Sequence, residues 1–277
     1  MAGQPGKAAA ERLRALHEAG VLVLPNAWDA ASAAVIARAG AQAVATTSGG
    51  IAWSAGRHDG QGLARTEMIA RVREIVAAVA VPVTADVEGG YGAAPGDVAL
   101  TVEEVINAGA VGVNIEDSRA PGGPLFGPAE QAARIQAARA AATSAGLGEL
   151  FINVRTDVFL FGVGAPETRP DDVLARSRAY AGAGADGLFV PGLLDLEIIA
   201  ELAAASPLPV NVMAGPGAPS VAELAAAGVR RVSVGTAIAQ ASYTLAERAA
   251  TELLAAGSYA ALEGALDFGA INGLFES

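Results

Sequence analysis

The chain alternates eight times between a segment with helical periodicity and a short apolar strand, and this alternation restricts the fold more than any other feature. The strands are predicted at residues 21–24, 43–47, 81–85, 111–115, 150–154, 187–190, 209–213 and 229–234. Strict alternation requires parallel pairing, because each strand must be reached through a crossover helix. Eight such units closed on themselves predict an α/β fold of the (β/α)8 or TIM barrel type.

The predicted helices have recognisable ends. Four of them stop at an Ala-Gly pair just before a strand, which is typical of a left-handed helix stop, at Gly40, Gly109, Gly184 and Gly228. Thr101 with Glu104 has the spacing of a capping box, so a helix is predicted to begin there. Ser220 with Glu223 has the same spacing before the last strand, and Asp29 is predicted to cap the helix that ends at Gly40.

A doubly wound open sheet is the rival arrangement for the same alternation. The barrel is favoured because polar residues follow strand after strand, which suits a complete ring of loops better than one crevice. One domain is therefore expected over residues 1–277, with the barrel at about 21–236 and extra C-terminal helices within about 237–277. These helices, at 237–256 and 259–266, exceed what a barrel needs, and their alanine-rich faces favour contact with a neighbouring subunit.

Composition narrows the classes of function. The chain is 52% hydrophobic and 17% charged, but its longest uncharged run, residues 202–222, is broken by prolines and glycines, so no membrane helix is expected. The first ten residues lack the apolar core of a signal peptide, and a cytoplasmic location is expected. A formal net charge of −11 argues against a nucleic-acid partner. The absence of cysteine excludes disulfides, thiolate metal sites and a cysteine acid or nucleophile.

A predicted buried strand ends in two carboxylates and a glycine cluster within residues 83–92. Side chains alternate along a strand, so Asp86 and Glu88 point the same way if the extended geometry continues. Glu116 ends the next strand and is expected beside them on the C-terminal face of the barrel. Clustered carboxylates repel one another unless a cation lies between them, and hard oxygen ligands favour Mg²⁺ or Mn²⁺. A solvated acidic turn without a metal is the alternative.

Other strand ends supply groups that can bind an acid. Arg155 follows the fifth strand, and its planar guanidinium suits a carboxylate or a phosphate. Ser48, with the amides of Gly49 and Gly50, can bind a second oxygen of that acid. The alternative for Arg155 is a salt bridge to Glu116 that closes the barrel rim without a ligand.

These motifs resemble those of the isocitrate lyase/phosphoenolpyruvate mutase superfamily over residues 25–235. Residues 86–92, DVEGGYG, are similar to the family's Asp-Ala-Asp-Thr-Gly-Tyr/Phe-Gly metal motif, with Glu88 in place of its second aspartate. Residues 48–50 are similar to its Ser-Gly-Gly substrate-carboxylate loop, and Asp59 falls where the family has an aspartate of the metal shell. Residues 115–117 and 155–157 match its Ile-Glu-Asp and Arg-Thr-Asp.

The resemblance implies a Mg²⁺-dependent enzyme that acts on 2-oxo acids or their enolates. It also implies a homo-oligomer, a dimer or a dimer of dimers (a homotetramer), in which a C-terminal helix is exchanged between subunits. Such an exchange would account for the helices beyond the barrel.

Departures from the family pattern limit what the resemblance implies. The lyases carry a Lys-Lys-Cys-Gly-His type of loop after Ile-Glu-Asp, whereas residues 118–127 here read SRAPGGPLFG. The same segment lacks the lysine- and asparagine-bearing gate of phosphonomutases and phosphonopyruvate hydrolases. The lyases' Phe-Pro-Glu after the sixth strand is replaced by Phe-Val-Pro at 189–191. Asn211 is expected to keep the lyases' substrate-binding asparagine.

The sequence therefore predicts a Mg²⁺-dependent carbon–carbon lyase or decarboxylase of a small 2-oxo or 2-hydroxy dicarboxylic acid, acting through a metal-stabilised enolate. The substrate class is oxaloacetate-like or substituted-malate-like. Asp86, Glu88 and Glu116 are predicted to hold the metal, and Arg155 to bind the substrate carboxylate. A water molecule or Tyr91 is predicted to reprotonate the enolate carbon.

Two alternatives and one further role stay open. Cleavage of a malate-type acid needs a base, which Asp59 or His58 could supply. His17, on the N-terminal helix, is expected to lie away from the barrel mouth.

The first alternative function is cleavage of the P–C bond of phosphonopyruvate, with hydrolysis or transfer of its phosphoryl group. The second is a protein that binds 2-oxo acids without turning them over.

Overall fold

Parallel strands form the centre of the computed structural model, which describes residues 5–276. Their spatial order is β1 (Leu22–Leu24), β9 (Arg231–Ser233), β8 (Val210–Met213), β7 (Gly187–Phe189), β6 (Phe151–Arg155), β5 (Gly112–Glu116), β4 (Val83–Asp86), β3 (Val44–Thr46) and β2 (Asn26–Ala27). Each neighbouring pair runs parallel. The carboxyl ends of the strands therefore lie on one face of the molecule.

The sheet closes on itself at Pro25. Strands β1 and β2 stand at the two ends of the spatial order, yet only Pro25 separates them in the chain. Leu22 pairs with Arg231 of β9, whereas Asn26 pairs with Ala45 of β3. They are two halves of one strand that changes partner at a residue without a backbone N–H. The predicted (β/α)8 barrel is confirmed, and the open doubly wound sheet is excluded.

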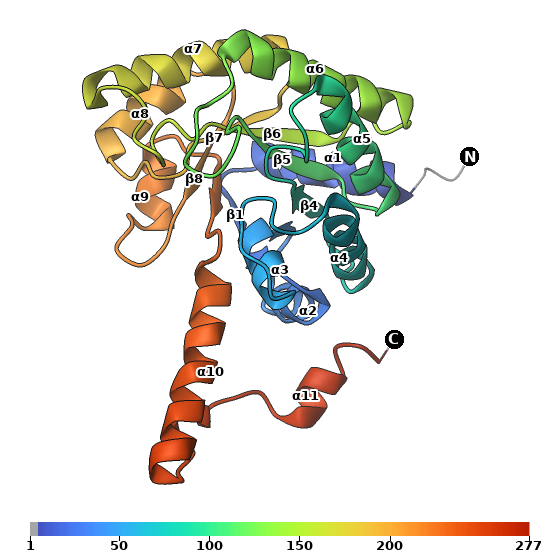
Figure 1. Ribbon diagram of the computed structural model, residues 1–277, viewed down its shortest axis with the longest axis vertical. Coiled ribbons are helices and arrows are strands. Elements are labelled where there is room, and N and C mark those ends of the chain that lie inside the picture. The colour runs from blue at the N-terminus through green and yellow to red at the C-terminus, as the bar shows by residue number, and fades with distance from the viewer. Residues whose placement is uncertain (1–4, 277) are drawn as a thin grey trace.

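Helices surround the barrel (Figure 1). They are α1 (Pro5–Glu18), α2 (Ala30–Arg38), α3 (Ser48–Ser54), α4 (Arg65–Ala77), α5 (Pro95–Asn107), α6 (Pro128–Ser144), α7 (Arg169–Gly182), α8 (Leu196–Ala205), α9 (Val221–Ala226), α10 (Ala237–Ala256) and α11 (Phe268–Asn272), with short 3-10 turns η1 (Pro166–Thr168) and η2 (Ala260–Leu262). Successive side chains of each strand point in turn to the apolar layer beneath the helices and to the interior of the barrel. Along β5, Val113 and Ile115 are buried in the apolar core, whereas Asn114 faces the barrel interior.

Several local predictions are confirmed. The predicted helix stops all have positive φ, with values of 102°, 93°, 97° and 91° at Gly40, Gly109, Gly184 and Gly228. Ser220 Oγ accepts from Glu223 N at 3.3 Å, and Glu223 Oε2 accepts from Ser220 N at 2.7 Å, which completes the capping box. Asp29 Oδ1 accepts from Ser32 N at 2.7 Å and so caps α2.

Three local predictions are wrong. Helix α5 begins at Pro95, so Thr101 lies inside the helix, where its hydroxyl donates to backbone carbonyls. Proline at the first helical turn was the stronger start signal. Residues 48–50 form the first turn of α3 and are not a loop. Residues 259–266 hold only the short turn η2, and α11 begins after its cap at Asp267.

Helix α1 covers the amino end of the barrel. The His17 ring stacks on Phe151, the first residue of β6, with ring centroids 3.9 Å apart. Burial, followed by the nearby charge of Arg231, lowers the pKa of His17 to about 4. His17 therefore lies at the opposite end of the strands from Arg155, away from the barrel mouth as expected.

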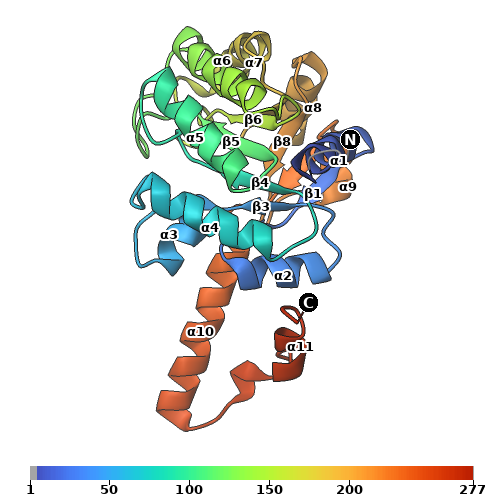
Figure 2. The ribbon, with the colours of Figure 1, turned by 90° about the vertical axis from the view of Figure 1, so that its right-hand side faces the viewer.

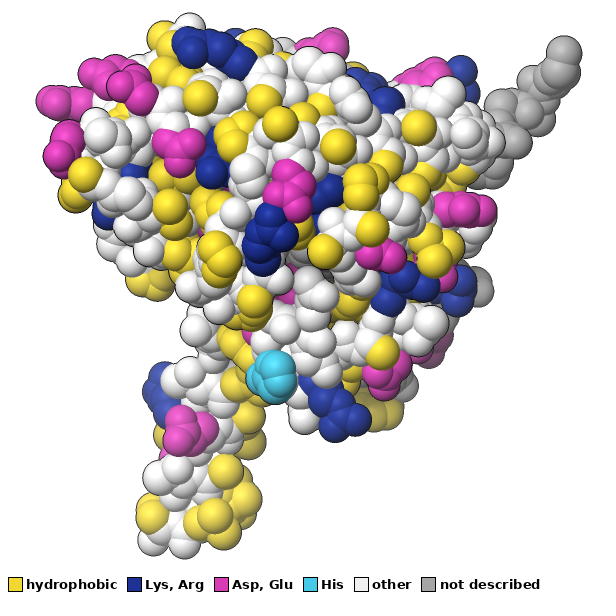
Figure 3. Space-filling view, turned by 45° about the horizontal axis from the view of Figure 1, so that its top comes forward, with side chains coloured by type: hydrophobic (Ala, Val, Ile, Leu, Met, Phe, Trp, Pro, Cys, Tyr) yellow, Lys and Arg dark blue, Asp and Glu magenta, His cyan; other side chains and the backbone are white. Residues whose placement is uncertain are grey.

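The residues beyond the barrel form an arm on its outside, here called the C-terminal arm (residues 237–276). Helix α10 extends away from the barrel, and α11 turns back toward α2 (Figures 1 and 2). Arg38 of α2 donates to Ala270 O at 3.1 Å. Hydrophobic side chains gather at the far end of the arm (Figure 3), and Leu254 and Phe268 are 86% and 81% exposed. No helix within residues 5–276 is both long and apolar enough to cross a membrane.

Candidate functional site

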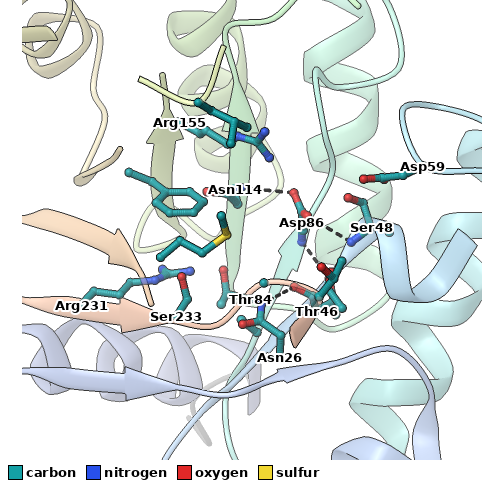
Figure 4. Close-up of a pocket in the computed structure, with 18 residues that line it drawn as sticks. Asn26, Thr46, Ser48, Asp59, Thr84, Asp86, Asn114, Arg155, Arg231 and Ser233 are labelled. Carbon is teal, nitrogen blue, oxygen red and sulfur yellow. Dashed lines mark hydrogen bonds between the residues drawn. The ribbon is translucent and has the colours of Figure 1, made fainter. Parts of the chain in front are cut away.

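A cavity of about 180 Å³ lies at the carboxyl ends of the strands and reaches into the barrel (Figure 4). The predicted site residues that line it are Ser48, Gly49, Asp59, Asp86 and Arg155. Polar residues that were not predicted also line it, namely Asn26, Thr46, Thr47, Thr84, Asn114, Arg231, Ser233 and Thr236. The barrel thus brings residues that are far apart in the sequence to one place, as expected for the C-terminal face of this fold.

Asp86 is the last residue of β4, and neighbouring donors hold its carboxylate. Oδ2 accepts from the backbone N–H of Ser48 at 3.1 Å, and Oδ1 accepts from Asn114 Nδ2 at 3.2 Å. The backbone N–H of Asp86 donates to Thr46 Oγ1 at 2.8 Å. Because Ser48 begins α3, the positive end of that helix faces a carboxylate. Asp86 is therefore fixed in one orientation at the cavity wall.

The two glycines that follow Ser48 are required by space. A Cβ at Gly49 would lie 2.9 Å from Thr236 Cγ2 and 3.1 Å from Asp59 Oδ2. A Cβ at Gly50 would lie 2.8 Å from Trp28 Cβ. Glycine therefore lets the first turn of α3, whose amides have no partner within the helix, pack closely against these side chains.

Glu88 is positioned by a turn, which corrects the extended geometry expected for it. β4 ends at Asp86, and Glu88 has a φ of 50°. Its carboxylate accepts from the backbone N–H of Gln61, and the Tyr91 hydroxyl lies 3.4 Å from Oε1. Burial, followed by the charges of Asp86 and Asp59, raises the pKa of Glu88 to about 7. Glu88 is therefore close enough to Asp86 for the two charges to repel each other, although Glu88 does not line the cavity.

Arg155 and Glu116 end neighbouring strands in register. Arg155 Nη1 lies 3.0 Å from Glu116 Oε2, and Arg155 Nε donates to Asp157 Oδ1 at 2.6 Å. Burial raises the pKa of Glu116; Arg155 opposes this shift, and the charges of Asp157, Asp86 and Glu88 add to it. The rim salt bridge considered as an alternative is therefore present, and it coexists with a cavity beside Arg155.

The acidic residues lie close enough to influence one another's charge. The charge of Asp86 acts on both Glu88 and Glu116, so the three carboxylates oppose one another's ionisation. Within the described part of the chain, no three His, Asp or Glu side chains are arranged to hold a metal ion together. A divalent ion at Asp86 would therefore have to keep several waters, as Mg²⁺ commonly does. Direct ligation by all three predicted residues stays a prediction.

Asn211 lies inside the barrel and does not line the cavity. Its Nδ2 donates to Arg231 O at 3.1 Å, and its Oδ1 accepts from Asn153 Nδ2 at 3.1 Å. These contacts use its amide within the interior layer of the barrel, so the structure does not bring Asn211 to the expected substrate position. The other residues considered that do not line the cavity are Gly50, His58, Glu88, Tyr91 and Glu116.

Sequence reasoning missed the polar residues inside the strands. Arg231 and Ser233 are two positions apart on β9, and Asn114 precedes Glu116 by two on β5. Strand alternation places such pairs on the same face, so the signal was present. The prediction had considered only the strand ends.

The segment that replaces the lyase and mutase loops stays outside the cavity. Ser118 pairs with Leu125, and the Arg119 guanidinium lies 4.2 Å from the centre of the Phe126 ring. No residue from 118 to 127 lines the cavity. The segment therefore gives the cavity neither an acid nor a base.

Comparisons with known proteins agree with this geometry. A sequence model of the phosphoenolpyruvate phosphomutase family matches residues 13–254. A Mycobacterium tuberculosis protein of uncharacterised function is 38% identical over 222 residues, which cover 80% of each chain. An oxaloacetate decarboxylase of a Bradyrhizobium species is 35% identical over 175 residues, which cover 61% of this chain and 57% of that protein.

Solved structures resemble the whole molecule. A Burkholderia cenocepacia protein proposed to be a lyase or mutase has a TM-score of 0.91 and 40% identity, covering 99% of this chain and 97% of that one. Oxaloacetate acetylhydrolase in complex with its product oxalate has a TM-score of 0.84 and 26% identity, covering 99% of this chain and 94% of that one. With its motifs, its barrel and this match over residues 13–254, the chain belongs to the phosphoenolpyruvate phosphomutase family of the isocitrate lyase/phosphoenolpyruvate mutase superfamily.

Proposed function

We propose that this protein is a divalent-metal-dependent lyase that decarboxylates, or cleaves a C–C bond of, a small 2-oxo dicarboxylic acid of the oxaloacetate class. The observation that carries the proposal is one cavity lined by Asp86, the first turn of α3 and Arg155. Two relatives named for oxaloacetate chemistry, a decarboxylase and an acetylhydrolase, support this choice of substrate. A 2-hydroxy acid of the substituted-malate class is the second choice.

Asp86 is the carboxylate that would hold Mg²⁺ or Mn²⁺, with Asp59, Glu88 and Glu116 reached through water. When bound there, the ion supplies Lewis-acid stabilisation of the negative charge that develops on the 2-oxo oxygen.

The residues of the chain orient the acid. The Ser48 hydroxyl and the Gly49 amide lie at the cavity wall and suit one carboxylate, because the first-turn amides of a helix have no intrahelical partner. Arg155 uses Nη1 and Nε for Glu116 and Asp157, which leaves donors of its guanidinium for the substrate.

The proton balance needs little from the protein. When the C–C bond breaks, CO₂ leaves and the electron pair of the broken bond passes into the enolate. The enolate carbon then takes one proton. Water that enters beside the exposed Asp59 is the proposed source of that proton. The Tyr91 hydroxyl lies next to the Glu88 carboxylate, and burial raises the pKa of Tyr91. The hydroxyl therefore stays protonated and can donate a hydrogen bond to Glu88.

Phosphonopyruvate is the second candidate substrate, because the matching family is named for phosphoenolpyruvate phosphomutase. Its P–C bond would break with transfer of the phosphoryl group to water, which gives phosphate, and the enolate that remains would take one proton to give pyruvate. The segment at residues 118–127 disfavours this reaction, since it has neither lysine nor asparagine.

Products distinguish the reactions. Purified protein with Mg²⁺ or Mn²⁺ is incubated with oxaloacetate, 2-methylisocitrate, dimethylmalate or phosphonopyruvate, and the rate in protein-free metal buffer is subtracted. Pyruvate with CO₂ from oxaloacetate supports decarboxylation, and oxalate with acetate supports hydrolytic cleavage. Pyruvate with phosphate from phosphonopyruvate supports P–C chemistry. Tight binding of oxalate without any turnover would replace the enzyme by a binding protein.

Asp86→Asn is expected to lower the metal-dependent rate at least about 100-fold, because the variant loses the charge at the centre of the acidic group. Asp171→Asn is the matched control, since Asp171 is exposed in the first turn of α7. Its rate should equal that of the wild type. Full activity of Asp86→Asn would remove Asp86 from the proposed metal site.

A further inference from the structure

Arg231 is a buried cation without a partner. It begins β9 and is 3% exposed, and it lines the cavity. Its Nε and Nη1 are buried and donate to no hydrogen-bond acceptor, and its guanidinium forms no ion pair within residues 5–276. Burial of an unpaired charge is strongly unfavourable, so such a group is expected to be kept for something that it binds.

Two hydroxyl side chains line the cavity together with Arg231. Thr84 Oγ1 lines the same cavity and is buried without a hydrogen-bond partner. Ser233 lies two positions after Arg231 on the same face of β9; its Oγ accepts from Asn211 Nδ2 at 3.3 Å, which leaves its hydroxyl hydrogen free to donate. Figure 4 shows Arg231, Ser233 and Thr84 at the inner end of the cavity and Asp59 at the other side of the view. A guanidinium that is not ion-paired, together with two hydroxyls, suits an anion.

The two arginines of the cavity differ in charge balance. Arg155 is already paired with Glu116 and Asp157, so much of its charge is compensated. Arg231 is not compensated, and the one acidic side chain whose charge acts on its pKa is Asp86. A ligand that carries a second negative group would therefore gain most at the Arg231 end.

We propose that Arg231, Thr84 and Ser233 form an inner anion subsite that binds the second carboxylate of a dicarboxylic substrate. The 2-oxo acid end of the same molecule then lies beside Asp86 and the first turn of α3. This inference rests on the proposed function, and it predicts that the site prefers a dicarboxylic acid to a monocarboxylic one. The cavity of about 180 Å³ suits a molecule of that size.

The test compares two probes by titration calorimetry in Mg²⁺ buffer. Pyruvate offers only the 2-oxo acid end, and 3,3-difluorooxaloacetate carries both carboxylates. The wild type should bind the dicarboxylate at least about 10-fold more tightly than pyruvate, the gain expected for one charge-assisted hydrogen-bonded pair. Arg231→Gln should lose about 10- to 100-fold of the affinity for the dicarboxylate and less than about 3-fold of that for pyruvate.

Matched variants keep the test sharp. Arg230→Gln removes the same charge from the exposed neighbouring position and should leave both affinities unchanged. Thr84→Val keeps the shape of the side chain and should weaken only the dicarboxylate. Circular dichroism checks that each variant folds. If Arg231→Gln does not fold, the two single variants Thr84→Val and Arg231→Lys are tested in its place.

The outcomes separate the two proposals. If the wild type binds neither probe, the proposed function fails. If it binds pyruvate but has no preference for the dicarboxylate, or if Arg231→Gln keeps the preference, the inner subsite is overturned while the proposed function stands. If chloride or phosphate raises the melting temperature of the wild type but not of Arg231→Gln, and the preference is absent, a free inorganic anion occupies the subsite and the substrate assignment is overturned.

Discussion

Asp86 and Arg231 line the same cavity but are held in opposite ways. The carboxylate of Asp86 accepts hydrogen bonds from Ser48 N and Asn114 Nδ2, which fix its direction. No side chain of the described residues accepts a hydrogen bond from the Arg231 guanidinium, so a ligand can set its direction. At the residue scale, one end of the cavity is preorganised and the other is completed by what binds there.

The buried Glu88 makes stability depend on pH. The pKa of Glu88 rises from 4.5 to about 7 on folding, so between these values the folded state binds more protons than the unfolded state. The contribution of Glu88 to stability in EDTA should therefore fall as the pH rises from about 4.5 to 7, by up to about 3 kcal/mol, against the opposite contribution of His17. Mg²⁺ favours the charged carboxylate, so its stabilising effect should be larger at pH 8 than at pH 5.

Thermal unfolding of the wild type and of Glu88→Gln, each in EDTA and in Mg²⁺, checks this expectation. The variant cannot ionise at this position, so its decline between pH 5 and 8 should be smaller. A wild type whose stability rises over this range in EDTA, with a parallel curve for Glu88→Gln, would contradict it.

Residues at strand ends could be predicted from the sequence because each one follows directly on an apolar run. Asp86, Arg155 and Ser48 were placed at the cavity in this way, and the motif resemblance supported Asp59. The direction of Glu88 could not be predicted, because its φ of 50° depends on a turn that no local pattern encodes. Arg231 lies at the beginning of its strand, where the prediction did not look.

At the scale of elements, α3 links the sheet to the cavity. The helix begins directly after β3, so its amino end faces the last residue of β4. Gly49 in its first turn packs against Thr236 and Asp59. A side chain at position 49 would therefore push against Thr236 and Asp59, two residues that line the cavity.

Gly49→Ala is expected to impair binding more than folding. Alanine favours the helix, but its Cβ would lie 2.9 Å from Thr236 Cγ2 and 3.1 Å from Asp59 Oδ2, so the mouth must rearrange. The affinity for a 2-oxo acid should fall at least about 10-fold, whereas the melting temperature changes by only a few degrees, about 1 kcal/mol in stability. Calorimetry and thermal unfolding measure the two effects.

Gly96→Ala in α5 is the matched control, because a Cβ there meets nothing within 4 Å. It should bind like the wild type and be equally or more stable. Unchanged binding by Gly49→Ala would show that the mouth tolerates the added methyl group.

Elements were more predictable than their connections. The four glycine helix stops and the alternation of strands are local signals that tertiary contacts reinforce. The pattern at Thr101 and Glu104 misled the prediction because the same spacing also occurs within a helix, where the threonine hydroxyl bonds to earlier carbonyls. The switch of partner at Pro25 depends on both neighbouring strands and has no local signature.

At the scale of the whole molecule, the C-terminal arm leaves apolar surface uncovered. Leu254 and Phe268 are 86% and 81% exposed, and Tyr259 is 66% exposed. A single chain gains little from this surface, whereas a second copy could bury it. We expect the protein to form a homo-oligomer through the arm, as the motif resemblance implied.

Leu254→Glu combined with Phe268→Glu is expected to reduce the oligomer to monomers, because each change places a charge in a desolvated contact. Size-exclusion chromatography with light scattering gives the mass of each form. Leu100→Glu is the control, since Leu100 is an exposed leucine on α5, outside the arm. A monomeric wild type, or an oligomer that survives both changes, would contradict the expectation.

The seam between β1 and β9 has a consequence for how the protein is made. Leu22 pairs with Arg231, so the last strand to leave the ribosome completes both the ring and the wall that carries the inner arginine. Contacts between such distant positions form late and slow the search for the native state. A nascent chain that stops before residue 230 lacks β9, so neither the closed barrel nor the part of the cavity lined by Arg231 can form. Binding of a dicarboxylate during translation would therefore begin only after the final strand has been synthesised.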